Sequence, residues 1–424
     1  MNIPYLVKKL IPGYVANDVK ILFKRQIVEI YLQKSEDNSE PLICSRCGTK
    51  LAQKRGSHQM KIKHLPIFGL DCYLIFYRQK ANCPHCKKAR SEHIDFLARE
   101  TPHLSKEYSW WLGRLTEIST VSRVAELTGN DQNTLWRIDY DRLVLMLQNY
   151  KIPDVKRISV DEVHARSKRR YSRENRNKQY FTVVSDLDTG RVIWVSNNRE
   201  KEALDEFYTL LGEERCSQIE VAAMDQFNGY KASTEQYCPQ AKIVWDRFHL
   251  MRNFESALND ERLEIIEKNK KEKKSVSKIT GKFKYLFLKK AKKRTKAEVK
   301  SFKQVMRDNK EFYKLELIKE RFFHFFYQRD IEDARDILIE VKSWIKENGF
   351  KYLENWVDNF VGGWEIVKNY FEIRVTSALS EGQNNVIKAL KRRCFGFKNM
   401  TYFKLKIMQV CGYLNSRYIS IDNY

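Results

Sequence analysis

Five short apolar runs in the middle of the chain constrain its fold more than any other feature. They cover residues 157–163, 179–186, 191–196, 219–225 and 241–246. Their length and their content of β-branched and aromatic residues are typical of strands. A helical stretch near 202–212 separates the third run from the fourth, and the turn Asp188-Thr189-Gly190 indicates a hairpin between the second and the third. The pattern predicts an α/β domain built on a mixed sheet.

A ribonuclease H-like fold has the element order of three strands, a helix, a strand, a helix and a strand. The same order is expected here, so we predict this fold for residues 151–424. Asp161 and Asp225 lie at the ends of the first and fourth runs, where such a sheet places two acids. A third acid, Glu381, opens a helix-like segment near the C-terminus. Acids so placed can converge on one point and indicate metal-dependent phosphodiester chemistry. Glu162 should face the opposite side of its strand.

The segment 377–393 reads as an amphipathic helix. Glu381, Asn384, Asn385 and Lys388 are spaced by three and four residues, so they share one helical face, with Val386 and Leu390 expected to pack behind it. We predict that this face forms one wall of an active site. The basic residues that follow are predicted phosphate contacts: Lys391, Arg392 and Arg393. An ordinary charged surface helix is the alternative.

Four cysteines in the β-rich N-terminal part, residues 1–99, form two Cys-x-x-Cys pairs. The pairs are Cys44 with Cys47 and Cys83 with Cys86, and strand-like runs at 19–33 and 70–80 accompany them. A structural zinc site needs four ligands, and each pair supplies two thiolates. We therefore predict a zinc ribbon with one structural Zn²⁺. The total of nine cysteines is odd, which argues against a disulfide framework. A redox role for the pairs is the alternative.

Residues 100–150 are helical, and 121–140 within them has the pattern of a helix-turn-helix. Ala125 is small where two helices must approach, Gly129 suits the turn, and Leu135 and Ile138 form an apolar face. The outward positions of the second helix have side chains suited to base edges and phosphates, and they are Gln132, Asn133, Trp136, Arg137 and Tyr140. A plain helical hairpin is the alternative.

The charge balance points to a polyanionic partner. Lysines and arginines number 78 against 54 acids, a net charge of +24, and the one-signed run 268–296 lies in a helical insertion at about 250–374. The chain has no apolar run of 18 residues and no phosphate-binding Gly-x4-Gly-Lys-Ser/Thr loop. We expect a cytoplasmic, nucleoid-associated protein that uses neither a membrane nor a nucleotide cofactor.

Taken in order, these motifs resemble the bacterial insertion-sequence transposases of the ISL-three family. The resemblance rests on the cysteine pairs, the helix-turn-helix, Val-Asp-Glu at 160–162, Met-Asp at 224–225, Trp-Asp-Arg-Phe-His-Leu at 245–250 and Ser-Glu-Gly-Gln-Asn-Asn at 380–385. It covers nearly the whole chain. Single motifs of this kind are common, but their order is specific.

The resemblance implies a DDE-type catalytic domain in which Asp161, Asp225 and Glu381 hold two Mg²⁺ or Mn²⁺ ions. Asp246 and His249 match an accessory pair beside such centres, with a structural histidine as the alternative. The implied activity is binding of the terminal inverted repeats, followed by DNA strand cleavage and strand transfer. The implied partners are double-stranded DNA of the transposon ends and target, and further copies of the chain in a homodimer or higher oligomer.

Two other functions fit part of the pattern. A DNA-binding regulator descended from a transposase would keep the cysteine pairs and the helix-turn-helix but would not need the three acids. A ribonuclease H-like nuclease or junction resolvase would need the acids but not two DNA-reading modules.

Overall fold

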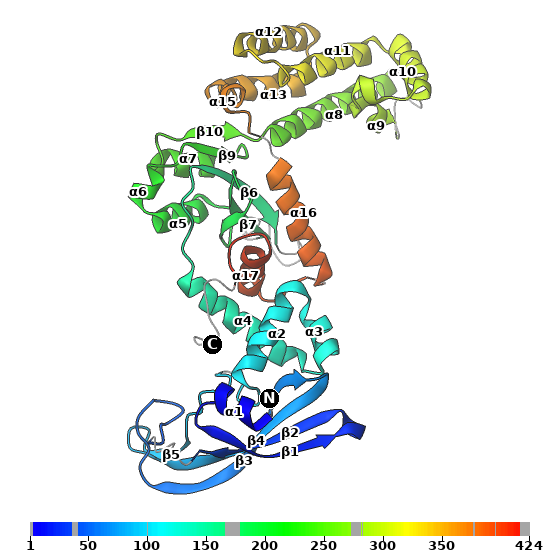
Figure 1. The fold of residues 1–424 in the computed structure, drawn as a ribbon. Coiled ribbons are helices and arrows are strands. Elements are labelled where there is room, and N and C mark those ends of the chain that lie inside the picture. Colours follow the sequence, from blue (N-terminus) through cyan, green and yellow to red (C-terminus); the bar gives the residue numbers. More distant parts are fainter. Residues whose placement is uncertain are drawn as a thin grey trace. The chain divides into compact units, whose positions relative to one another are not determined.

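The computed structural model describes residues 3–35, 41–99, 101–165, 179–272, 281, 283–375, 378–394 and 396–415. The chain forms two compact units, shown in sequence colours in Figure 1. One comprises Met1–Lys151 with Leu390–Tyr424, and the other comprises Ile152–Ala389. Residue 151, where the catalytic domain is predicted to begin, is the last residue of the N-terminal part of the first unit. The C-terminal residues differ from the expected domain 151–424, because those from Leu390 onward cluster with the N-terminal unit.

A five-stranded sheet forms the N-terminal part of the first unit. Its strands pair in the order β1-β2-β4-β3, with β5 added to β4, and helix α1 (Ile3–Leu10) precedes them. The strands are β1 (Tyr14–Leu22), β2 (Ile27–Lys34), β3 (Lys54–Ile67), β4 (Leu70–Cys83) and β5 (Lys88–Ser91). Alternate residues of β2, namely Val28, Ile30 and Leu32, are buried in one core, as the two-residue period of a strand requires.

The single strand expected at 19–33 is wrong. The chain reverses through the short 3-10 turn η1 (Phe23–Arg25), and Gln26 adopts a left-handed conformation with φ of 55°. β1 and β2 are therefore an antiparallel hairpin. Nothing in this turn is glycine or proline, so the usual sequence signals of a reversal are absent.

Three helices follow the sheet: α2 (Lys106–Ile118), α3 (Val121–Thr128) and α4 (Gln132–Asn149). Thr120 caps the start of α3 and Asp131 caps the start of α4. Between them Gly129 has a φ of +66°, which glycine adopts without strain. Leu135 and Ile138 are buried in the core of this module. Two helices joined by a turn at Gly129 therefore occupy the segment for which a helix-turn-helix is predicted.

The last helix of the first unit, α17 (Met400–Val410), packs against α4 through a buried polar cluster. Asp139 is fully buried and accepts hydrogen bonds from Thr116 (2.8 Å), Tyr402 (2.5 Å) and Lys406 (3.1 Å). Burying a carboxylate without hydrogen-bond partners would destabilise the fold by roughly several kcal/mol. The contacts with Tyr402 and Lys406 therefore hold α17 in one position against α4. They explain why the C-terminal residues belong to this unit.

The second unit is built on a mixed sheet with strand order β10-β9-β6-β7-β8. Its strands are β6 (Arg157–His164), β7 (Tyr180–Asp186), β8 (Val192–Val195), β9 (Val221–Met224) and β10 (Lys242–Trp245), and all five expected strands are confirmed. β6, β7 and β8 form an antiparallel meander, whereas β9 and β10 run parallel to β6. The helices of the crossovers are α5 (Lys201–Leu211), α6 (Glu213–Cys216) and α7 (Asn228–Tyr237).

A helical insertion follows β10, as expected. Its helices are α8 (Arg247–Lys271), α9 (Phe283–Leu288), α10 (Lys296–Asp308), α11 (Lys310–Phe325), α12 (Ile331–Asn348), α13 (Lys351–Gly362), α14 (Trp364–Val367) and α15 (Asn369–Ile373). They share a core rich in phenylalanine, in which Phe254 and Phe322 lie 4.4 Å apart between ring centres. This core is shared with the sheet, because Val221 and Ala223 of β9 and Val244 of β10 belong to the same cluster.

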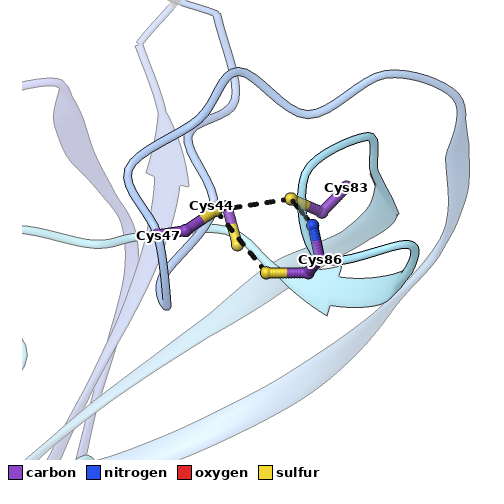
Figure 2. Close-up of side chains that lie close together, drawn as sticks. All are labelled: Cys44, Cys47, Cys83 and Cys86. Carbon is purple, nitrogen blue, oxygen red and sulfur yellow. Dashed lines mark hydrogen bonds between the residues drawn. The ribbon is translucent and has the colours of Figure 1, made fainter.

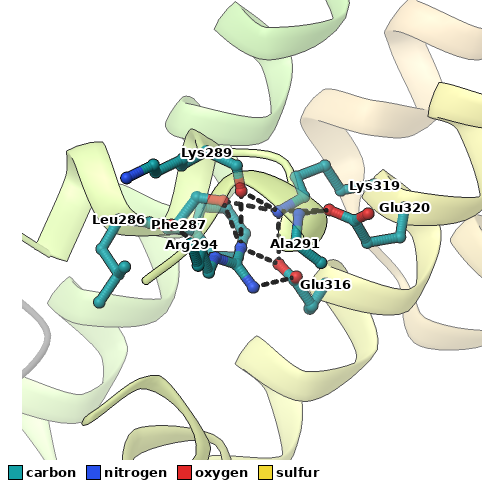
Figure 3. A network of polar contacts seen from close by, with 8 residues as sticks. All are labelled: Leu286, Phe287, Lys289, Ala291, Arg294, Glu316, Lys319 and Glu320. Carbon is teal, nitrogen blue, oxygen red and sulfur yellow. Dashed lines mark hydrogen bonds and ion pairs between the residues drawn. The ribbon is translucent and has the colours of Figure 1, made fainter. Parts of the chain in front are cut away.

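Part of the basic run 268–296 has a structural role within this insertion. Figure 3 shows Arg294 and Lys319, both almost fully buried, around Glu316. Arg294 donates to the carbonyl oxygens of Leu286 and Lys289, and Lys319 donates to that of Phe287 at 2.7 Å. These cations satisfy carbonyls at the C-terminal end of α9. Residues 273–280 and 282 of the run lie outside the described residues.

The helix predicted at 377–393 is α16 (Ala378–Arg393). Its packing face differs from the expected one: Val386 is 45% exposed, whereas Ile387 is fully buried. Gln383 accepts a hydrogen bond from Ser185 of β7 at 3.0 Å. The helix is therefore rotated by about one residue from the predicted phase, because the buried Ile387 lies four residues from Gln383 and on the same side of the helix. In the described part of the chain, no helix is long and apolar enough to cross a membrane.

Candidate acidic metal centre and thiol cluster

Three acids of the second unit lie at one level of its sheet. In the parallel pairs, Val160 of β6 is opposite Met224 of β9, and Trp245 of β10 is opposite the same Met224. The residue that directly follows each of these three positions in the sequence is an acid: Asp161, Asp225 and Asp246. Because neighbouring strands lie about 4.8 Å apart, one acid at the same level on each strand forms a row of carboxylates.

Asp161 is held from two sides. Its Oδ1 accepts the backbone N–H of Glu162, and its Oδ2 accepts the carboxamide N–H of Asn384, both at 2.6 Å. Asn384 belongs to α16, so this bond attaches that helix to the centre of the sheet. Of the residues predicted on one face of this helix, Asn384 thus contacts Asp161.

His249 lies between the other two acids. Asp246 caps α8 by accepting the N–H of Phe248 at 2.8 Å, and His249 stands three residues further along the first turn. The Nδ1 of His249 contacts a carboxylate oxygen of Asp225 and lies 3.3 Å from Oδ2 of Asp246. The spacing Asp-x-x-His thus has a local cause, since residues three apart in a first helical turn are neighbours.

The pKa values of these groups reflect their crowding. Burial raises the pKa of Asp161 to about 6, and the nearby charge of Asp225 adds to the rise. Burial alone would lower the pKa of His249, but its contacts with Asp225 and Asp246 outweigh burial and raise that pKa to about 10. The protonated imidazole therefore supplies positive charge to a row of acids.

Glu162 is separate from this row. Its carboxylate pairs with Arg199 at 2.8 Å, and the guanidinium of Arg199 lies over the rings of Tyr180 and Phe227. Burial raises the pKa of Glu162 to about 7, although the charge of Arg199 opposes the rise. Arg199 is not among the predicted site residues, because it lies in a polar loop after β8 and has no motif around it.

The third predicted acid, Glu381, lies in α16, one turn before Asn384. Its side chain is outside the described residues. Among the described side chains, ligand atoms of Asp161, Asp225 and His249 lie within 4.8 Å of one another. Two carboxylates suit Mg²⁺ or Mn²⁺, which prefer oxygen ligands and retain several waters. The donor set therefore fits a divalent cation.

The four predicted cysteines of the first unit converge. Figure 2 shows their sulfur atoms directed toward one another, and all four lie within 4.8 Å of one another. The Sγ of Cys47 is 3.5 Å from those of both Cys83 and Cys86. Backbone N–H groups also point at the sulfurs, from Arg46 to Cys44 and from Cys86 to Cys83. Such spacing fits a tetrahedral ion with metal–sulfur bonds of about 2.3 Å.

The thiols differ in acidity. Hydrogen bonding with Thr49, 3.4 Å away, lowers the pKa of Cys47 to about 5. Sharing a hydrogen bond with Cys47 raises the pKa of Cys86 to about 11. Four clustered thiols cannot all ionise without a cation, and a zinc ion removes that conflict.

The predicted DNA-contacting residues are mostly exposed. Gln132, Asn133 and Arg137 lie on the open side of α4, as do Lys388 and Arg392 on α16. Lys391 is half-buried, and Arg393 donates to the carbonyl oxygen of Ile118 at 3.0 Å. Trp136 stacks on Tyr140, and both rings contact Tyr402, so these two aromatic residues pack partly within the unit.

Comparison with known proteins agrees with the geometry of both sites. Residues 158–407 match the model of the ISL3 family of DDE-type proteins, described as a transposase, and residues 40–86 match the zinc-finger of transposase IS204/IS1001/IS1096/IS1165. The chain is 23% identical over 385 residues to a transposase for insertion sequence element IS1001 from Bordetella parapertussis, covering 90% of both chains.

It is also 26% identical over 229 residues to a transposase for insertion sequence element IS1557 from Mycobacterium tuberculosis, covering 52% of this chain and 47% of that relative. The family match spans more than half of the chain and includes Asp161, Asp225 and His249. The resemblance seen in the motifs is confirmed. The chain belongs to the ISL3 family of insertion-sequence transposases.

Proposed function

We propose that this chain binds the terminal inverted repeats of an insertion sequence and catalyses magnesium-dependent DNA cleavage and strand transfer. The observation that carries the proposal is the row of acids on β6, β9 and β10, joined to α16 by the bond from Asn384 to Asp161. The sheet order, with a meander followed by two parallel strands, supports a ribonuclease H-like catalytic domain.

Asp161 and Asp225 would hold the divalent ions, with Glu381 as the third acid. When bound, Mg²⁺ or Mn²⁺ supplies charge stabilisation for the attacking and leaving oxygens of a phosphodiester exchange. Asn384 orients Asp161 by occupying one of its oxygens. His249 holds a proton on Nδ1 between Asp225 and Asp246, which neutralises part of the row until DNA arrives. The reaction exchanges one phosphodiester bond for another, so no nucleotide energy source is needed.

DNA recognition is assigned to the first unit. The exposed Gln132, Asn133 and Arg137 on α4 would read base edges, and a net charge of +24 supports contact with phosphates. Lys388, Lys391, Arg392 and Arg393 would continue these phosphate contacts along α16. The four cysteines would hold one structural Zn²⁺. Because two transposon ends must be joined, we assign a homodimer or higher oligomer to the DNA-bound form.

The test is incubation of the purified full chain with DNA that carries the inverted repeats flanking its gene, Mg²⁺ and a target plasmid. Strand-transfer products are expected from the wild type and should fall by about a thousandfold for Asp161→Asn or Asp225→Asn. Specific binding of the repeats without any cleavage would instead support the DNA-binding regulator. Cleavage without preference for the repeats would support a nuclease or resolvase.

A further inference from the structure

An open cavity of about 600 Å³ lies in the second unit between α8 and α13. Carboxamides dominate its polar lining, from Gln226, Asn228, Asn253, Asn355 and Asn359. We call this space the amide cavity. Among the described residues no lysine or arginine lines it, although the chain as a whole is strongly basic. Its chemistry therefore differs from that of a phosphate-binding surface, which needs cations.

The carboxamides of α13 lie on one side of that helix. Asn355 and Asn359 are four residues apart and exposed, whereas Leu353, Val357 and Phe360 of the same helix are buried in the core of the insertion. Neither Asn355 nor Asn359 makes a side-chain hydrogen bond to another described residue. Across the cavity, Asn253 of α8 donates to Gln226 at 2.9 Å. The cavity thus presents donors and acceptors that are open to a ligand.

Two indole rings complete the lining. Trp356 is held by Phe254 and Phe322, with ring centres 4.7 and 4.8 Å away. Trp245 packs against the backbone of Gly363, where an added Cβ would lie 2.0 Å from the indole. Only glycine at 363 leaves room for this ring. Both rings are half-buried, so each keeps a surface that a planar ligand can contact.

Two lining residues of the amide cavity are sequence neighbours of residues of the acidic centre. Gln226 directly follows Asp225, and Trp245 directly precedes Asp246. Trp245 also lines a second, small cavity together with Asp161 and Asp246. A ligand in the amide cavity would therefore lie beside the place where a phosphodiester would be cut.

We propose that the amide cavity binds an unpaired nucleobase of the DNA strand next to the cleaved phosphodiester, an inference that rests on the proposed function. Carboxamides match base edges because each offers both a donor and an acceptor. The lining also includes Asp260, whose carboxylate can accept a hydrogen bond from an exocyclic amine. The indoles of Trp245 and Trp356 supply the stacking surface that single-stranded DNA sites use. Stacking and edge contacts offset the cost of unpairing the base.

The test compares two duplexes that carry the inverted repeat, one fully paired and one with three mismatched positions at the junction with flanking DNA. Binding by the full chain is measured without added magnesium, so that cleavage does not interfere. We expect the wild type to bind the mismatched duplex about tenfold more tightly, since stacking on aromatic rings has roughly that effect per base. Each unpaired base is then replaced in turn by an abasic site. At one of the positions, this replacement should remove the affinity advantage of the mismatched duplex over the paired one.

The double variant Asn355→Ala with Asn359→Ala should lose most of the advantage and become insensitive to that abasic site. Gln304→Ala is the matched control, because Gln304 is an exposed carboxamide on α10 outside the cavity. A second variant, Gly363→Ala, displaces Trp245 and should also reduce the advantage. Thermal melting of every variant shows whether it is folded.

Equal affinity of the wild type for both duplexes would overturn the proposal, and so would a full advantage retained by the folded double variant. Cleavage of the paired duplex by the wild type in Mg²⁺ is measured in parallel. Cleavage at the repeats without a mismatch advantage rejects the nucleobase site while the transposase activity stands. An advantage that depends on Asn355 and Asn359, without cleavage, supports the nucleobase site and rejects the catalytic function.

Discussion

The thiol cluster of the first unit and the acidic centre of the second are assembled in opposite ways. Each Cys-x-x-Cys pair brings two ligands together within four residues, and Cys44 and Cys83 are almost fully buried. The acidic centre takes one residue from each of three strands, and its side chains remain partly open to solvent. A closed site with four protein ligands stabilises a fold, whereas an open site can exchange ligands during a reaction.

The largest expected effect concerns the thiol cluster. Cys47→Ser should abolish zinc binding and unfold the N-terminal sheet, because a structural zinc site of this kind contributes about 10 kcal/mol or more. The zinc content of the full chain, measured by metal analysis, should fall from one ion per chain to none. Thermal melting should show that the first unit is no longer folded. Cys394→Ser, which changes a cysteine outside the cluster, should retain the zinc. A Cys47→Ser protein with full zinc content would refute the structural site.

The acidic centre should respond to loss of the helix contact. Asn384→Ala removes the hydrogen bond that orients Asp161, so Mn²⁺ affinity should weaken by about 10- to 100-fold. Calorimetric titration of the full chain with Mn²⁺ measures this change. Asn385→Ala is the matched control, since Asn385 is exposed on the same helix. Zinc content should be unchanged in both variants, and equal Mn²⁺ affinities would show that Asn384 does not position Asp161.

The two sites should also differ in their response to pH. Because the pKa of Asp161 is raised to about 6, this carboxyl is protonated below that pH and ionised above it. A cation must then displace a proton, so Mn²⁺ affinity should fall by about tenfold for each pH unit below 6. The lowered pKa of Cys47, about 5, should keep zinc bound through the same range. The prediction would be contradicted if, as the pH is lowered, zinc were released at a higher pH than the one at which Mn²⁺ binding is lost.

The smallest effect is expected from Thr49. Thr49→Val removes the hydrogen bond that favours the Cys47 thiolate, so the pH at which half of the zinc is lost should rise by less than about one unit. Zinc release followed with a chromophoric chelator measures that midpoint. Ser45→Ala, an exposed change in the same knuckle, should leave it unaltered. An unchanged midpoint for Thr49→Val would mean that Thr49 does not tune the thiolate.

Sequence patterns predicted the elements of the second unit well, because its strands are short, apolar and bounded by turns. They predicted less about positions that depend on packing. The phase of α16 was wrong by one residue, since Val386 and Ile387 are equally apolar and only contact with the sheet distinguishes them. The hairpin at Gln26 was missed because it contains no residue that usually marks a turn.

By itself, the sequence determined the four paired cysteines, the order of strands and helices along the second unit and the membership of a transposase family, and it predicted two acids at strand ends. Each of these depends on local spacing or on a run of neighbouring residues. Only the tertiary structure showed that Asp246 completes the row begun by Asp161 and Asp225, that α17 belongs with α4, and that carboxamides of α8 and α13 surround one cavity. Those features join segments far apart in the chain, and their geometry follows from strand register and helix packing.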